Sequence, residues 1–228
     1  MIRRGKVLAR LTFAFRFDPV FPILDVRGNI VKELMNTKLF TESSIGPHGI
    51  IIKAKTDDGE VTTSIEVGSI SGTIAKIDMT INDYQILYNT IDMIIKDLEI
   101  TKFNYIGYRQ FRIVAAEESL RLVYNTITTS TCLRDNEAPF DDVGIIYQGK
   151  IDDYNYRIHY GPFGNDNEHD IKALDHDMFR EVDNGFIYDC DISQQDKTIR
   201  SFNMLSRIEA ANKRTEKIIK AVEASYEK

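Results

Sequence analysis

The sequence predicts an α+β protein built from two β-α-β-β-β-α modules in tandem, which form antiparallel sheet with helices packed on one face. Apolar and polar residues alternate over several short segments, a pattern typical of strands with one buried face. Other segments carry apolar residues at helical spacing. The order of these elements in the first half of the chain returns in the second half, which favours a duplication over a coincidence.

The first module, residues 1–100, opens with the strand 7–17, VLARLTFAFRF, in which every second residue is apolar. Asp18-Pro19 ends this strand because proline has no N–H for the ladder. Apolar residues then follow helical spacing from Ile23 to about Phe40. The remaining elements are a hairpin at 50–69 that turns at Asp57-Asp58-Gly59, a strand at 70–80 and an amphipathic helix at 81–98.

The second module, residues 101–228, repeats this order and ends in a long amphipathic helix. No linker rich in proline, glycine or serine occurs at residues 97–103, so we expect the two modules to pack as one unit. The predicted elements are a strand at 103–115, a helix at 117–128, a hairpin at 143–160 turning near Asp152-Asp153, a strand at 185–193 and a helix from about Asp196.

Composition limits the classes of function. The formal net charge is −6, which disfavours broad electrostatic binding to nucleic acid or to an anionic membrane. No run of 18 apolar residues occurs, and Arg10 and Arg16 interrupt the apolar stretch after the basic start MIRRGK, so we expect neither a transmembrane helix nor a signal peptide. Two cysteines, Cys132 and Cys190, favour reduced, buried thiols. These features together predict a cytoplasmic protein.

Four segments carry a resemblance to a known family: the strand LTFAFRFDP, the central strand IGYRQFRI, the strand FIYDCDIS with its Asp-x-Asp, and the closing helix MLSRIEAANKRTEKIIKAVEAS. Over most of its length the chain resembles a sporadically distributed family of uncharacterised bacterial proteins. That family tends to continue from the central arginine into Tyr-Ile-Asn, whereas Arg109 is followed here by Gln110, Phe111 and Arg112. The resemblance implies a patchy bacterial distribution, as genes of mobile elements or host-defence islands show, and no catalytic residues.

Acidic residues and histidines are concentrated in the segment 161–177, GPFGNDNEHDIKALDHD. The spacing matches neither an EF-hand loop nor His-Glu-x-x-His. Asp and Asn side chains in such loops usually bond their own backbone, so a solvated loop is favoured over a metal site.

A sharper metal hypothesis lies on the neighbouring strands. Alternation places Asp189 and Asp191 on one face of the strand 185–193, and Arg157 and His159 on one face of the hairpin. If the two strands pair, His159, Asp189 and Asp191 could reach one divalent ion. The alternative, which we favour, is a pair of cross-strand contacts in which Arg157 meets one aspartate and His159 meets the other.

A second candidate surface lies on the central strand, where Phe103, Tyr105, Arg109, Phe111 and Ile113 are expected on one face. Aromatic residues with an arginine on an open sheet bind single-stranded nucleic acid in several modules. Core packing of these residues is the favoured alternative, because aromatic strand faces are usually buried.

No nucleotide-binding loop, catalytic triad or other enzyme signature occurs, so catalytic residues are unknown, no cofactor is expected, and a divalent metal is the one candidate. The sequence therefore favours a non-enzymatic interaction or regulatory subunit of a bacterial multi-protein assembly, of a defence or mobile-element system by the resemblance. Its partner would be another protein subunit or a second copy of the chain. The C-terminal helix either binds a partner or closes the sheet. The alternatives are a metal-dependent hydrolase or nuclease using Asp189, Asp191 and His159, and a single-stranded nucleic-acid-binding protein using Tyr105, Arg109 and Phe111.

Overall fold

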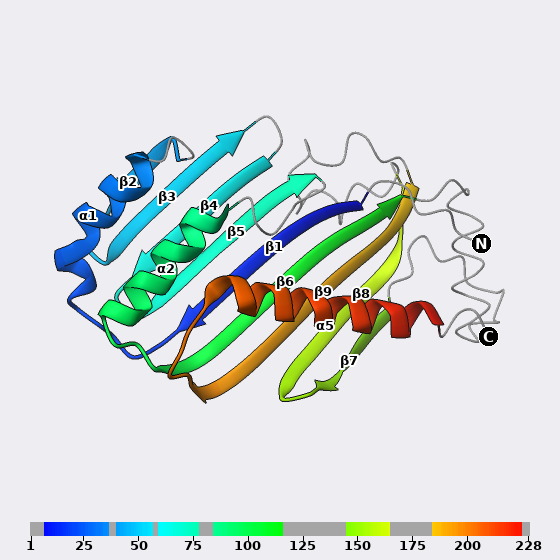
Figure 1. Cartoon of the computed structure of the whole chain (residues 1–228). Helices are drawn as coiled ribbons and strands as arrows, with labels where there is room; N and C mark the ends of the chain where they lie inside the picture. Colours follow the sequence, from blue (N-terminus) through cyan, green and yellow to red (C-terminus); the bar gives the residue numbers. More distant parts are fainter. Residues whose placement is uncertain are drawn as a thin grey trace.

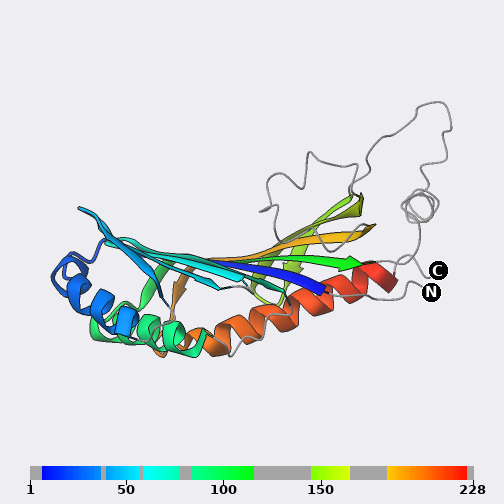
Figure 2. The same cartoon turned by 90° about the horizontal axis from the view of Figure 1, so that it is seen from above.

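The computed structural model describes residues 7–36, 40–56, 59–77, 84–115, 145–164 and 184–224. Over these residues the chain forms one antiparallel sheet of nine strands and three helices, which confirms the predicted α+β class (Figure 1). The view in Figure 2 shows the three helices along the same face of the sheet. None of the described helices is long and apolar enough to cross a membrane.

The first half of the chain supplies five strands and two helices to this arrangement. The strand β1 contains the predicted alternation, and the hairpin of β3 and β4 is followed by β5 after a turn at Val67-Gly68. The element bounds are β1 Val7–Arg16, α1 Ile23–Asn36, β2 Glu42–Ile45, β3 Gly49–Thr56, β4 Gly59–Glu66, β5 Ser69–Ile77 and α2 Gln85–Asp97.

The second half supplies four strands and one long helix among the described residues. The predicted hairpin is present, with Asp152 and Asp153 at its turn. The element bounds are β6 Lys102–Ala115, β7 Ile145–Ile151, β8 Tyr154–Gly164, β9 Asn184–Thr198 and α5 Met204–Ala224.

The strands follow the order β2-β3-β4-β5-β1-β6-β9-β8-β7, so the first strands of the two halves, β1 and β6, lie side by side at the centre (Figure 1). The register pairs Phe13 with Tyr108 and Phe15 with Ile106. Because side chains alternate between the two faces of a strand, all four point to the face that carries the helices. Each of the four is buried.

An aromatic cluster joins the sheet to the segment before α5. The ring of Phe202 lies 5.2 Å from the ring of Phe15 and stacks on Phe103 at 5.4 Å. Phe17 meets Phe103 edge to face at 6.2 Å. Pairs of this kind add about 0.5–1.5 kcal/mol beyond the area that they bury. The cluster therefore fixes the point at which α5 begins to cross the sheet.

The helix α5 closes the sheet along one apolar stripe. Its buried residues recur every three or four positions and include the predicted Ile208, Ala211 and Thr215. Arg112 of β6 reaches the same helix from below, donating hydrogen bonds to the side chains of Glu216 and Asn212. The predicted role of closing the sheet is therefore observed, and partner binding by the exposed side of this helix stays a prediction.

The structure differs from the prediction at three elements. The last helix begins at Met204 and not near Asp196, because β9 continues to Thr198 by pairing with β6. The first helix ends at Asn36, short of Phe40. The strand β2 was not predicted. The predicted helix at 117–128 lies outside the described residues, so the tandem pattern of two complete modules stays a prediction.

Candidate functional site

One face of the sheet carries none of the described helices, and we call it the helix-free face. Tyr105 and Arg109 of β6 lie on this face. The register also places their partners there, because Arg16 of β1 pairs with Tyr105 and Asp191 of β9 pairs with Arg109. Its described residues on the five central strands are Arg10, Thr12, Ala14, Arg16, Ser69, Ser71, Thr73, Ala75, Tyr105, Gly107, Arg109, Phe111, Ile187, Asp189, Asp191, Ser193, Gln195, Asn155, Arg157, His159 and Gly161.

An arginine–carboxylate pair lies near the centre of the helix-free face. Arg109 donates from Nε to Oδ1 of Asp189 at 2.7 Å and from Nη2 to Oδ2 at 2.5 Å. Two parallel hydrogen bonds fix the guanidinium plane, which a single bond would leave free to turn. The hydrogen bonds to Asp189 raise the pKa of Arg109. Arg109 nevertheless keeps 60% of its side chain exposed, while Asp189 is only 16% exposed. The pair therefore holds an arginine ready for contact with a second molecule.

Asp191 lies between two arginines on the same face. The register sets it opposite Arg109 on one side and Arg157 on the other. Burial raises the pKa of its carboxyl group, the charge of Asp189 adds to that effect, and the two arginines oppose it. The face thus alternates positive and negative groups across three strands.

Tyr105 forms a second ordered contact on this face. The guanidinium of Arg16 lies 5.4 Å from the centre of its ring. The ring covers Gly107, where a β-carbon would collide with it. Burial and the negative charge of Asp191 raise the pKa of the Tyr105 hydroxyl. Gly107 is therefore needed to let this aromatic ring lie flat along the sheet.

The structure places Tyr105, Arg109 and Phe111 together on the helix-free face, as their alternation predicts. The favoured alternative, core packing of this strand face, was therefore wrong for these three residues, because the core lies on the opposite face of β6. Phe103 was expected beside them, and that prediction was wrong, because Phe103 is 1% exposed within the aromatic core. Strand pairing is interrupted between Phe103 and Tyr105, opposite Asp196 with its positive φ of 50°. Alternation of faces is broken at this point. The side chain of Ile113 lies outside the described residues.

The three predicted metal ligands share one face of two adjacent strands. His159 lies opposite Asp189, and Arg157 lies opposite Asp191, which is the register that both the metal hypothesis and the cross-strand alternative require. Both carboxylate oxygens of Asp189 accept hydrogen bonds from Arg109. Among the described residues, no group of three histidine, cysteine or acidic side chains is arranged to hold a metal ion. The metal hypothesis stays a prediction, and it would require Asp189 to leave Arg109.

Two other predicted features can be placed only in part. Cys190 points into the core and is fully buried, and burial raises the pKa of its thiol to about 12. Its thiolate is therefore scarce near neutral pH, as expected for an inert thiol. Cys132 and most of the acidic segment 161–177 lie outside the described residues.

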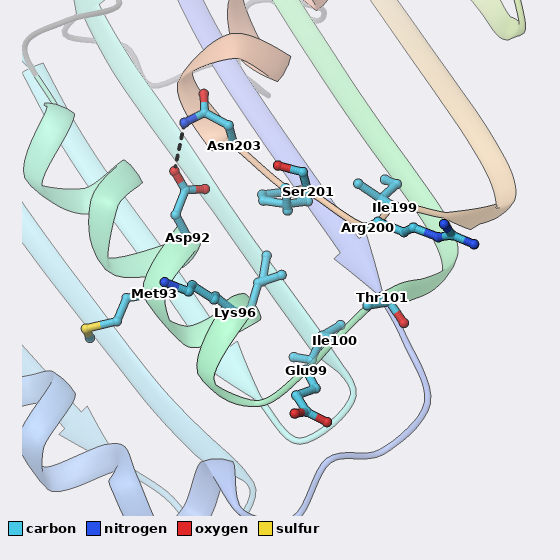
Figure 3. Close-up of a pocket in the computed structure, with 12 residues that line it drawn as sticks. Asp92, Met93, Lys96, Glu99, Ile100, Thr101, Ile199, Arg200, Ser201 and Asn203 are labelled. Carbon is cyan, nitrogen blue, oxygen red and sulfur yellow. Dashed lines mark hydrogen bonds between the residues drawn. The ribbon is translucent and has the colours of Figure 1, made fainter.

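A cavity of about 730 Å³ lies between the end of α2 and the start of α5, a feature that sequence reasoning missed (Figure 3). Asp92 accepts hydrogen bonds there from the backbone N–H of Met204 at 2.7 Å and from Nδ2 of Asn203 at 3.3 Å. Asn203 in turn accepts the N–H of Ser206 at 2.8 Å, so it is the N-cap of α5. An asparagine directly before a stretch with apolar residues at helical spacing is the sequence signal for this cap, but nothing in the sequence pointed to Asp92.

Two of the polar side chains at this cavity, Asp92 and Asn203, are hydrogen-bonded to each other and to the backbone of α5. The carboxylate of Asp92 occupies the N-terminus of α5, where its negative charge is stabilised by the helix dipole. Burial nevertheless raises the pKa of Asp92, and the hydrogen bond from Met204 opposes this rise. We therefore assign the cavity a structural role in joining α2 to α5.

The described part of the chain defines an α+β protein in which α1, α2 and α5 cover one face of the sheet, and the helix-free face carries ordered charged and aromatic side chains at its centre. No protein-family model matches the chain, and comparison with curated proteins and with solved structures finds no match either. The class of function therefore has to come from the surface itself.

Proposed function

We propose that this protein is a non-enzymatic interaction subunit of a cytoplasmic protein assembly and that it binds a protein partner through the helix-free face. The observation that carries the proposal is the exposed guanidinium of Arg109, held in a fixed plane by Asp189. The resemblance described above extends the proposal to a bacterial assembly of a defence or mobile-element system.

The composition of the helix-free face supports a protein partner. Arginine and tyrosine dominate the energetics of protein interfaces, and side chains that are already ordered lose little entropy on binding. Arg109 is ordered by Asp189, and Tyr105 is ordered between Arg16 and Gly107. A face with several such anchors can therefore bind with less loss of side-chain freedom than one with mobile lysines.

The charges on this face favour a partner that carries both signs. Asp189 and Asp191 lie among Arg16, Arg109 and Arg157, so the local field does not have one sign. A polyphosphate backbone is attracted by a surface of uniformly positive charge. Complementary pairs of opposite charges are instead a source of specificity between proteins.

The half of the face on β1, β4 and β5 has small hydroxyl side chains, which let another backbone come close. Thr12 and Thr73 lie side by side with their hydroxyl oxygens 3.2 Å apart. Ser71 pairs with Ala14 on one side and with Ser64 on the other. This half is flat and carries hydroxyl groups that can form hydrogen bonds, and it lies next to the charged residues of β6, β9 and β8.

The test is native mass spectrometry of the tagged protein isolated from its own host, for the wild type and two variants. We expect a stoichiometric protein partner with the wild type and its loss with Arg109→Ala. Lys32→Ala, on the exposed side of α1, is the matched control and should retain the partner. Circular dichroism establishes that each variant is folded. A folded Arg109→Ala protein that retains the partner in full would contradict the proposal.

Single-stranded nucleic acid is the second candidate ligand, favoured by the gathering of Tyr105, Phe111 and Arg109 on one face. Bases stack on aromatic rings at about 1–3 kcal/mol each. Fluorescence anisotropy with a labelled oligothymidine should then show binding that weakens steeply with salt and is lost in Tyr105→Ala. No binding at low salt would remove this candidate.

We also propose that the two halves of the chain arose by duplication. In each half the last strand returns to pair with the first: β5 pairs with β1, and β9 pairs with β6. The two sets are then joined through β1 and β6. This order supports a two-fold relation across the β1–β6 pair, and nuclear magnetic resonance of residues 117–128 would test for the predicted helix there.

A further inference from the structure

The two edges of the described sheet differ in how far they are protected. β2 forms one edge with four residues, and β7 forms the other with seven (Figure 1). β7 pairs with β8 at every position from Ile145 to Ile151. Its outer side therefore presents a regular row of backbone donors and acceptors over the whole strand.

β7 has few of the features that keep an edge strand from pairing. Native edges are usually short, kinked by a bulge or proline, or rich in charge. β7 contains no proline and one charged residue, Lys150. On the helix-free side of the strand, Ile146 is 51% exposed. An apolar side chain at an open edge is a position where a second strand gains by covering it.

The sequence of β7 is compatible with antiparallel pairing to itself. With Gln148 at the two-fold axis, Ile146 lies opposite Lys150 of the second copy, and Ile145 lies opposite Ile151. Tyr147 lies opposite Gly149, so its ring can cover a position that has no side chain. No like charges meet in this register. A two-fold arrangement also closes, so pairing stops at a dimer.

The helix side of the same edge is incompletely packed. Ile145, Tyr147 and Ile151 are only half-buried although they pack against the core. Beside them lies a cavity of about 270 Å³, which is lined by residues of β7, by Tyr156 of β8 and by Ile218 and Val222 of α5. A second copy of β7 would bring its own Ile145, Tyr147 and Ile151 to this side. The apolar residues of the edge would then be covered on both sides of the pair.

From the self-compatible register and the half-covered apolar edge, we propose that two copies of this chain associate through antiparallel pairing of β7 with β7. The sheet would then continue through the dimer with one helix-free face on each copy. This interface is distinct from the surface assigned to the partner, and it does not rest on that assignment.

The test is sedimentation velocity of the purified full chain over a roughly hundredfold range of concentration, since dimer formation depends on concentration. The wild type should shift from monomer to dimer. Ile146→Lys places like charges opposite each other at two symmetric positions and should weaken association at least tenfold. Ile146→Glu places a carboxylate opposite Lys150 at the same positions and should leave the dimer intact or strengthen it.

Both substitutions introduce a charge at the same exposed site. Comparing the two variants with each other therefore controls for the loss of isoleucine. A wild type that stays monomeric over the whole range would overturn the proposal. So would a dimer that the two variants affect equally, because the register would then be wrong. Neither variant alters Arg109 or Tyr105, so failure here leaves the proposed partner surface untouched.

Discussion

Two arginines of β6 lie three residues apart on opposite faces of the sheet and have different roles. Arg112 is 15% exposed and binds Glu216 and Asn212 of α5, whereas Arg109 is 60% exposed and binds Asp189. A buried hydrogen-bonded charge is expensive to leave unpaired, and an exposed ion pair contributes little. Arg112 therefore holds the fold, and Arg109 is available for binding.

Alanine at the two arginines should separate these roles in urea unfolding. Arg112→Ala should lower the free energy of unfolding by about 1–3 kcal/mol, because the buried side chain of Gln110 and the half-buried side chain of Asn212 lose their hydrogen-bond donor. Arg109→Ala should lower it by less than about 1 kcal/mol. Equal losses in the two variants would contradict the assignment of Arg112 as the structural arginine.

Asp191 gives a prediction for pH. Because the pKa of its carboxyl group is raised in the folded protein, the folded state binds this proton more tightly than the unfolded state. The stabilisation is full below the ordinary value of 3.8 and is lost as pH rises through the folded pKa. Asp191→Asn removes the ionisation, so the variant should be more stable than the wild type near neutral pH.

Urea unfolding below and above this window checks the sign of that effect. The advantage of Asp191→Asn over the wild type should grow as pH rises from below 3.8 toward neutrality. Arg109 and Arg157 oppose the effect of burial, so a variant that is less stable than the wild type near neutral pH would show that their attraction dominates.

At the scale of elements, α2 ends in a strained residue. The N–H of Ile100 donates to the carbonyl of Ile95 at 2.9 Å, and the N–H of Glu99 donates to the carbonyl of Lys96 at 3.1 Å. These two hydrogen bonds form a Schellman motif. Glu99 occupies its left-handed position with a φ of 52°, where glycine is usual. The β-carbon of Glu99 makes this conformation unfavourable.

Glycine at this position should therefore stabilise the protein. We expect Glu99→Gly to raise the free energy of unfolding by about 0.5–1 kcal/mol, the relief of strain less the added freedom of the unfolded chain. Glu99→Ala is the matched control, since it removes the carboxylate and keeps the β-carbon. Thermal unfolding of the three proteins measures the difference, and an equal gain in both variants would point to charge as the cause.

How far each element could be predicted depends on whether its pattern is local. β1, β8 and β9 bury every second residue, so alternation identified them. All four side chains of β2 are exposed, and it therefore left no pattern to read. The end of β9 was missed because Asp196 adopts a left-handed conformation inside the strand. Phe103 was assigned to the wrong face for the same reason.

For the candidate site, the sequence predicted which face of its strand each residue occupies, but not which residues contact one another. Alternation placed Arg109, Asp189 and Asp191 correctly, but the pairing of Arg109 with Asp189 depends on the register between β6 and β9, which no local pattern gives. The contact between Asp92 and Asn203 joins positions 111 residues apart. Long-range contacts of this kind are set by packing of the whole chain.

For the whole molecule, the central feature is a sheet whose described helices all lie on one face. Buried side chains from both halves of the chain form one cluster beneath the helices. The opposite face carries ordered charged groups at its centre and hydroxyl groups beside them. A molecule built in this way has a rigid platform, and the proposed function follows from what that platform presents.

Thiol labelling at position 71 measures whether the helix-free face is open in the isolated chain and covered by a partner in the assembly. Ser71 lies on the helix-free face among small side chains, so Ser71→Cys in a Cys132→Ser background adds one small thiol there. Cys190 serves as an internal control, since its buried thiol should not react in the folded protein. We expect fast labelling of this thiol in the isolated chain and strong protection in the native assembly. Slow labelling in the isolated, folded chain would contradict this expectation, because the face would then already be covered.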